Sequence, residues 1–323
     1  YTLFNIIDLN NKFIIVTSLA TLKNKQKAYL QLHTAVFLFG FTAILGKLIT
    51  LEQTALVWNR LWIAVLGLIF IPRVFRGILS IKKSNLLIFS GIGVLVALHW
   101  LTFYGSIKVG NSASVTLACL ATSSLFTSIL EPLITKSKFQ WVELLLGLLV
   151  IVGIYFLSGV GEAYYLAIVI GIISAFLAAL FSTLNKKYIT GQNSLSVSTI
   201  ELAAGFIFIS VCYPILQHLF PQPQWFPTGN DWWWLIVLGL LCTSLAFALS
   251  LEALKEISAF ISNLSINLEP VYGILLAIWI LNEDTQLNFD FYLGTAIILV
   301  AVLLHPIITK VQKRRLKLPA KHI

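Results

Sequence analysis

Long apolar runs separated by short polar clusters dominate the chain. None of the runs alternates apolar and polar residues as a barrel strand does, and each is long enough to cross a bilayer as a helix. Only helices and closed barrels satisfy their backbone polar groups in lipid. The pattern therefore predicts an all-α membrane protein with ten transmembrane helices. The predicted spans are residues 30–49, 54–71, 85–104, 113–134, 139–157, 164–184, 197–216, 232–251, 257–281 and 289–308.

Composition agrees with this prediction and excludes several classes of protein. The 323 residues are 58% apolar and only 11% charged, whereas a soluble domain carries about 25% charged residues. No hydrophilic stretch outside the tails is long enough for a soluble catalytic domain. The three cysteines lie far apart in apolar runs, so they predict neither disulfides nor a metal site, and we expect no cofactor.

The net charge of +9 reflects membrane topology. If the N-terminus is cytoplasmic, 19 of the 22 lysines and arginines fall in cytoplasmic segments, and the outer loops hold only Lys108. This asymmetry is what the positive-inside rule describes. It predicts a multi-pass protein, of the bacterial inner membrane, with both termini in the cytoplasm. Because the charges are scattered over several loops and tails, they do not predict a nucleic-acid partner.

The sequence also contains an internal repeat. Residues 97–108 (ALHWLTFYGSIK) align with residues 244–255 (SLAFALSLEALK) at an offset of 147, and the similarity continues after a one-residue gap. The repeat divides the chain into a tail (1–29), two halves of five helices (30–158 and 162–309) and a basic cytoplasmic tail (310–323). Because five is odd, the second half is inverted relative to the first. Inverted repeats build many secondary transporters, whose binding site lies near the midplane between the halves.

Residues 97–108, followed by SASVTLACLATSSLFTSILEPL, resemble the drug/metabolite transporter superfamily, in its EamA-like branch. The second-half segments SAFISNLSINLEPVYGILLAIWILNED and FYLGTAIILVAVLL carry the same resemblance. It implies a fold of two inverted five-helix repeats, with helices 1–4 and 6–9 around a central cavity and helices 5 and 10 at the periphery. It also implies export, or in some cases import, of amino acids or other small metabolites. The tryptophan-glycine pair common in span one of the family is Phe39–Gly40 here.

Four ionisable residues stand out inside the predicted spans, where a charge costs about 2.5–3.5 kcal/mol and needs a partner or water. Lys47 is close enough to the outer end of span one to snorkel. Arg60 lies six residues into span two, so a cavity or ion-pair role is favoured. Glu201 occupies a mirrored depth in span seven, 141 positions further on, and is interpreted as an ion-pair or gating residue.

Glu269 is the strongest single candidate, because it lies near the midplane of span nine and directly before Pro270. Proline removes a helical hydrogen bond, and a carboxyl at that depth changes its charge with hydration. Glu269 is therefore expected to bind a substrate ammonium group or carry a proton, unless it is a structural, protonated carboxyl. Asn263, Asn267 and Tyr272 extend a polar stripe along the same span and are predicted to bind substrate with Glu269.

Spans three and four add further candidates. Trp100 offers a flat face for an aromatic or cationic solute, and His99 beside it can titrate or donate a hydrogen bond. Glu131 and Pro132, at the cytoplasmic end of span four, are interpreted as a helix kink and gate. Ordinary helix packing is the alternative for each of these residues.

The sequence therefore predicts a secondary transporter, not an enzyme, that moves small organic metabolites, most simply amino acids in efflux, by alternating access. Its partners are a small-molecule substrate and the lipid bilayer. The alternatives are an importer of sugars or nucleotide-type metabolites, a membrane-embedded lipid-modifying enzyme, and a non-transporting scaffold. The glycines before Lys47 do not match a phosphate loop, since their spacing is wrong and Leu48 replaces the Ser or Thr, so no ATPase subunit is implied.

Overall fold

The computed structural model describes residues 2–157, 164–219, 221, 223–266 and 268–276, and then only short stretches of the C-terminal part. These stretches are 279–280, 289–290, 292–294, 296–298, 300–301, 304 and 307–308. All regular secondary structure in the described part of the chain is helical, which fits the predicted all-α fold. Six helical segments are long and apolar enough to cross a membrane, or seven if one bent helix pair is a single span.

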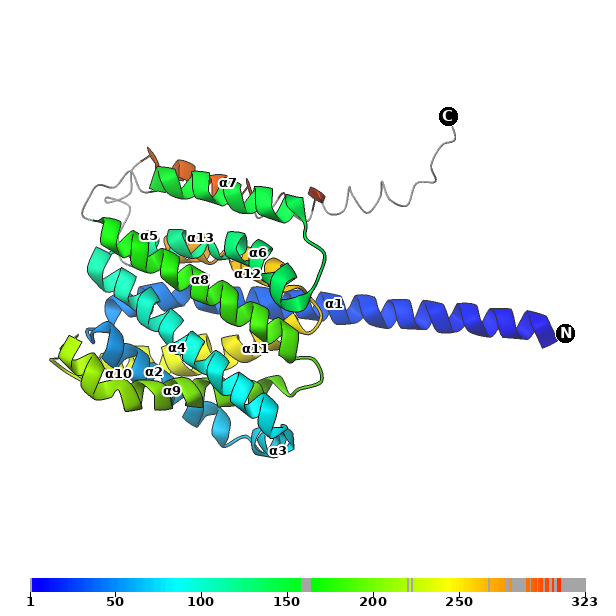
Figure 1. Cartoon of the computed structure of the whole chain (residues 1–323), viewed down its shortest axis with the longest axis horizontal. Coiled ribbons are helices and arrows are strands. Elements are labelled where there is room, and N and C mark those ends of the chain that lie inside the picture. The colour runs from blue at the N-terminus through cyan, green and yellow to red at the C-terminus, as the bar shows by residue number, and fades with distance from the viewer. Residues whose placement is uncertain are drawn as a thin grey trace.

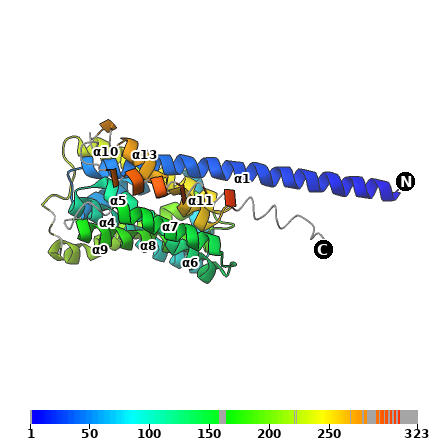
Figure 2. The same cartoon turned by 90° about the horizontal axis from the view of Figure 1, so that it is seen from above.

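The first helix, α1 (Thr2–Leu48), includes the segment that the sequence predicts as a tail. The sequence from Thr2 to Phe39 contains neither glycine nor proline, so nothing in it interrupts a helix. In Figure 1 the N-terminal part of α1 projects well beyond the bundle, and the turned view in Figure 2 shows the same projection. We call the end of the bundle from which α1 projects the proximal end, and the opposite end the distal end.

Span two ends earlier than predicted and continues as a separate helix. Helix α2 (Gln53–Ile69) is followed by α3 (Pro72–Ser80), and the two helices are bent by 95°. Ile71 is extended because a residue before proline avoids the helical region, and Pro72 then starts the new helix. A hydrogen bond from the Ser196 hydroxyl to the Val74 carbonyl (3.0 Å) fastens α3 to the bundle.

The remaining predicted spans of the first half are found within a few residues of their expected positions. Span three is α4 (Lys83–Gly110), and span five is α7 (Trp141–Leu157). Span four is interrupted: α5 (Ala113–Leu120) ends two residues before α6 (Ser123–Thr135) begins. Pro132 lies inside α6, so the interruption falls at Ala121 and Thr122 and not at the proline.

The second half repeats this arrangement. Span six is α8 (Tyr165–Tyr188) and span seven is α9 (Ser194–Leu219). Span eight runs through α10 (Asp231–Ile236), the π-helix η3 (Val237–Leu245) and α11 (Ala246–Leu254). Span nine consists of α12 (Ala259–Ile266) and α13 (Glu269–Leu276), and predicted span ten is described only in short pieces.

Packing relates the two halves to each other. Span one packs on span eight and span three packs on span six, which are equivalent contacts in a duplicated five-helix unit. Ser112 and Ser258 lie 146 residues apart, and their hydroxyls accept equivalent hydrogen bonds from Val115 N (3.3 Å) and Ile261 N (3.2 Å). Helix α7 lies on one face of the bundle beside the described C-terminal pieces (Figure 1), where Val150 and Ile298 share a small apolar cluster. Spans five and ten are therefore peripheral where they are described.

Candidate functional site

A cavity of about 730 Å³, including the space open to solvent, lies between the halves. Its wall is formed by α1, α2, α4, α5, α6, α8, α11, α12 and α13, which belong to spans one to four, six, eight and nine. Among the residues that the structure describes, none from span seven lines the cavity, although the family resemblance implies that this span faces it.

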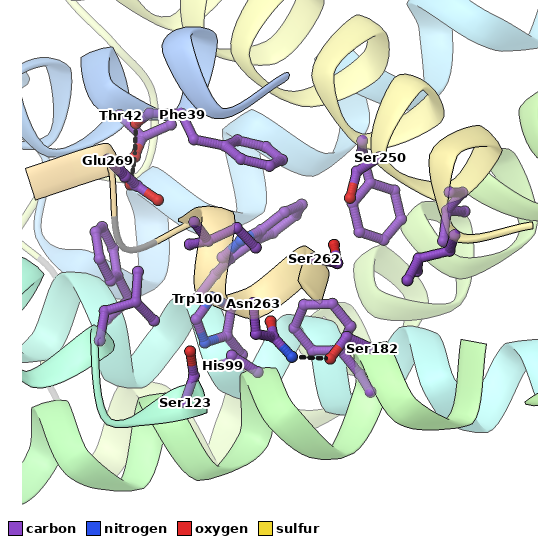
Figure 3. A pocket seen from close by; sticks show the side chains of 18 of the residues that line it. Phe39, Thr42, His99, Trp100, Ser123, Ser182, Ser250, Ser262, Asn263 and Glu269 are labelled. Carbon is purple, nitrogen blue, oxygen red and sulfur yellow. Dashed lines mark hydrogen bonds between the residues drawn. The ribbon is translucent and has the colours of Figure 1, made fainter. Parts of the chain in front are cut away.

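Five of the seven predicted substrate-binding residues line this cavity together: Arg60, His99, Trp100, Asn263 and Glu269. Tyr272 is not a lining residue, because its ring packs against Phe37 of α1 at 5.5 Å between centroids. Asn267 lies outside the described residues. Figure 3 shows Glu269, His99, Trp100 and Asn263 around one hollow.

The side chain of Arg60 is only 1% exposed. Its Nε donates to the Thr243 hydroxyl (2.6 Å), one terminal nitrogen donates to the Tyr104 hydroxyl (2.8 Å), and the other reaches the Cys242 carbonyl (3.4 Å). A guanidinium has five N–H groups, so these bonds leave two for a ligand.

The π-helix explains how Thr243 reaches Arg60. In η3 the Thr243 and Ser244 hydroxyls bond carbonyls five residues earlier, at Leu238 (2.6 Å) and Gly239 (2.9 Å). This spacing is that of a π-helix, which is frequent at functional sites. The Thr243 hydroxyl that accepts the hydrogen bond from Arg60 Nε thus belongs to this π-helix.

Trp100 carries the guanidinium of Arg60 on its ring face, at 3.8 Å from the centroid. Such a cation–π contact is strongest where both groups are desolvated. The face that the sequence assigns to a solute is thus occupied, at least on one side, by a cation of the protein itself. Phe39, Phe103, Phe181 and Phe247 supply further aromatic wall.

Glu269 is 3% exposed and accepts one hydrogen bond from the Thr42 hydroxyl at 3.3 Å. It is the first residue of α13, with Pro270 in the same turn, which is a favourable place for proline. Among the described residues, no lysine or arginine forms an ion pair with it. Arg60 and Glu269 nevertheless line the same cavity.

His99 and Asn263 are held by neighbouring helices. The Nδ1 of His99 lies 2.9 Å from both the carbonyl and the hydroxyl of Ser174 on α8. Asn263 donates to the hydroxyls of Thr127 (2.8 Å) and Ser182 (2.7 Å), and the second bond is drawn in Figure 3. Both side chains therefore fasten helices together as well as lining the cavity.

The predicted gating residues lie away from the cavity, except that Pro270 follows Glu269. Glu131 accepts hydrogen bonds from the backbone N–H groups of Ala259 (3.1 Å) and Phe260 (2.6 Å), so it caps the start of α12. Glu201 is fully buried beside Asn185. Lys47 is half-buried in the last turn of α1.

Sequence reasoning missed the residues that hold Arg60, and most of the hydroxyl groups around the cavity. Tyr104 and Thr243 are 44 and 183 positions from Arg60, so only the fold brings them together. The missed hydroxyl residues could have been found only as polar residues within apolar spans. Examples that line the cavity are Thr42, Ser250 and Ser262.

The two ends of the bundle differ in how they are closed. The cavity lining reaches Leu254 at the end of α11, near the proximal end. Toward the distal end, the Tyr104 ring fills the space beside Gly46, where an added Cβ would lie 2.5 Å from the ring. At the distal end itself, Asp231 accepts hydrogen bonds from the backbone N–H (3.0 Å) and hydroxyl (2.6 Å) of Thr50.

Comparison with known proteins identifies the class to which this architecture belongs. The EamA-like transporter family matches residues 26–159 and again 165–305. The chain therefore belongs to the EamA-like transporter family, within the drug/metabolite transporter superfamily, and is a multi-pass membrane transporter.

Individual relatives are distant. The uncharacterized transporter YetK of Bacillus subtilis (strain 168) is 22% identical over 296 residues, which cover 86% of each protein. A solved structure, described only as a crystal structure of protein, matches with a TM-score of 0.68 at 16% identity, covering 91% of this chain and 99% of that chain. At that identity the likeness concerns the fold alone.

Proposed function

We propose that the chain transports small zwitterionic metabolites, with amino acids as the substrate, and exports them by alternating access. The observation that carries the proposal is that Arg60 and Glu269 both line one cavity, while each is hydrogen-bonded to other residues and not to the other. A guanidinium binds a carboxylate, and a carboxylate binds an ammonium group. An α-amino acid carries both groups, and the surrounding phenylalanines suit an apolar side chain.

The difference between the two ends supports alternating access. The cavity extends toward the proximal end, while the Arg60–Tyr104–Thr243 contacts and the Asp231–Thr50 hydrogen bonds lie on its distal side. Two inverted halves have a second packing of similar energy in which the ends exchange roles. In this proposal the structure is the state open toward the proximal, cytoplasmic end.

Counterflow tests the proposal directly. Purified protein is placed in liposomes loaded with unlabelled amino acids, and entry of a labelled amino-acid mixture is measured with no ion gradient. We expect transient accumulation of label above that of protein-free liposomes. Exchange of sugars or nucleotide-type metabolites instead would replace the substrate assignment, and absence of exchange for all three classes would refute the transport proposal.

Topology is part of the same proposal: both termini lie in the cytoplasm, in the inner membrane of a bacterium. Single cysteines at Lys25 and Lys138 in a cysteine-free background should resist an impermeant maleimide in intact cells, while one at Glu52 should react. The opposite labelling pattern would place the open, proximal end of the cavity outside the cell and would contradict the proposed topology.

A further inference from the structure

Glu201 is buried away from the cavity and is not used in the proposed binding of substrate. Its side chain is 0% exposed and lies on α9, seven positions after the first residue of that helix. Among the described residues, no lysine, arginine or histidine forms an ion pair with it. A buried carboxylate without a cation is one of the costliest arrangements in a protein, so the neutral acid is the form that fits.

The neighbour of Glu201 is Asn185 of α8, which is also fully buried. The amide nitrogen of Asn185 donates to the Oε2 of Glu201 at 3.2 Å. The other two polar atoms of the pair, Glu201 Oε1 and Asn185 Oδ1, have no hydrogen-bond partner. Both are acceptors if Glu201 is ionised, and buried acceptors without donors are unfavourable.

One proton satisfies both atoms. A protonated Oε1 can donate to Oδ1, and the existing hydrogen bond from Nδ2 to Oε2 then closes the cyclic pair that a carboxylic acid and an amide form. Each unpartnered oxygen belongs to the same planar group as one end of the existing hydrogen bond. A single proton at Oε1 would give both oxygens of the pair a partner.

The surroundings leave the pair without a charged neighbour. Helix α4 presents Gly93 there, and an added Cβ would lie 2.1 Å from the Glu201 carbonyl oxygen, so α4 has no room for a cationic side chain at this point. The titratable groups on the helices around the pair include Arg60, Arg73, Arg76, Lys83, His99, Lys186, Lys187 and Glu252, and each of these is bonded to another partner or exposed.

Helix α8 connects the pair to the cavity. Ser182 lines the cavity and bonds Asn263, and Asn185 follows three residues later on the same helical face. A shift of α8 during a change of access would move Asn185 relative to Glu201 and admit water to the carboxyl.

We propose that Glu201 and Asn185 form a proton-binding site that holds one proton in this conformation and releases it to water when access changes. On binding, the proton forms an O–H bond at Oε1 and the carboxylate becomes a neutral acid. This inference rests on the proposed transport function, because only transport links the site to a net movement of protons. Glu201 carries the proton, and Asn185 is a positioning residue.

The first test needs no substrate. Difference infrared spectra of the purified, full-length protein are recorded at neutral pH for the wild type and for Glu201→Gln. We expect a protonated-carboxyl C=O band that shifts in D₂O, is lost in Glu201→Gln and persists in the control Glu143→Gln, on peripheral α7. In Asn185→Leu the band should move to higher frequency. A wild-type spectrum without a band assignable to Glu201 overturns the proposal.

The second test uses liposomes with the labelled amino-acid mixture. In the wild type, an imposed pH gradient should change the steady-state internal label at least several-fold. Glu201→Gln, whose amide can pair with Asn185, should retain counterflow and lose the response to the gradient. Counterflow without any gradient response in the wild type, or a response to sodium alone, overturns proton coupling and leaves the transport function intact. Absence of counterflow refutes the transport function, and the infrared test still decides the protonation of Glu201.

Discussion

The interrupted helices of spans four and nine share a layout and differ in chemistry. Each has an eight-residue first helix and a second helix that begins three positions after the first one ends, at positions 146 residues apart. The second helix starts with Ser123 in the first half and with Glu269 in the second half, and both residues line the cavity. The duplication therefore fixes where a side chain meets the cavity, while the residue at that place decides what it can bind.

The ends of these helices differ as well. Glu131 of α6 caps the start of α12, whereas the position that corresponds to it by the same offset is Ala277, which has no acceptor in its side chain. The Glu131 cap at the proximal end thus has no counterpart at the equivalent position, and the distal end is joined instead by the different contact of Asp231 with Thr50. This asymmetry can favour one direction of opening over the other, since two identical repeats would make both states equal.

The largest effect on transport is expected from removing the carboxylate at the first residue of α13. Glu269→Gln should lower amino-acid counterflow by about 10- to 100-fold, because a hydrogen bond to a charged group contributes about 1.5–3 kcal/mol. The matched control is Ser123→Ala, which should stay within about threefold of the wild type. Equal losses in the two variants would mean that the carboxyl has no special role.

A smaller effect is expected from Arg60→Lys, which keeps the charge and removes the planar fork. Losing the bonds to Tyr104 and Thr243 should lower the free energy of unfolding by about 1–3 kcal/mol. Counterflow should fall less than in Glu269→Gln. Thermal unfolding in detergent and counterflow measure the two effects separately, and unchanged counterflow in a folded variant would show that the guanidinium geometry is not needed.

Glu131→Gln sharpens the comparison between the ends. One amide oxygen replaces two carboxylate oxygens that receive the N–H groups of Ala259 and Phe260, so we expect a loss of about 1–2 kcal/mol in stability. The control is Glu256→Gln, which changes an exposed carboxyl just after α11. If both substitutions shift the unfolding temperature equally, the contact between halves contributes nothing specific.

The smallest effect on stability is expected from the two equivalent serine caps, one in each half. Ser112→Ala and Ser258→Ala each remove a helix cap, which should cost about 0.5–2 kcal/mol. Because the hydrogen bonds are 3.3 and 3.2 Å long in equivalent places, the two losses should be similar when each is measured by thermal unfolding. A clear difference between the two losses would mean that the caps at Ser112 and Ser258 do not contribute equally to stability.

Several features of the site could be predicted from the sequence because they are local. The depth of Arg60 and Glu269 within apolar runs follows from counting residues, and Pro270 marks the interruption of span nine. No comparable signal marks Ala121 and Thr122, where span four is interrupted without a proline. Glu131 was interpretable as a gate, but its backbone partners lie 128 and 129 positions away and could not be predicted.

The sequence by itself determined the membrane class, the run of apolar helices, the inverted duplication and the family, since each depends on periodicity, charge distribution or repeated letters. Tertiary structure alone decided which polar groups meet. Arg60 donates hydrogen bonds to Thr243 and Tyr104. Glu269 accepts one from Thr42, and Glu201 accepts one from Asn185. The physical reason is that a hydrogen bond depends on ångström-scale distances between side chains, and helices distant in sequence set those distances only when they pack.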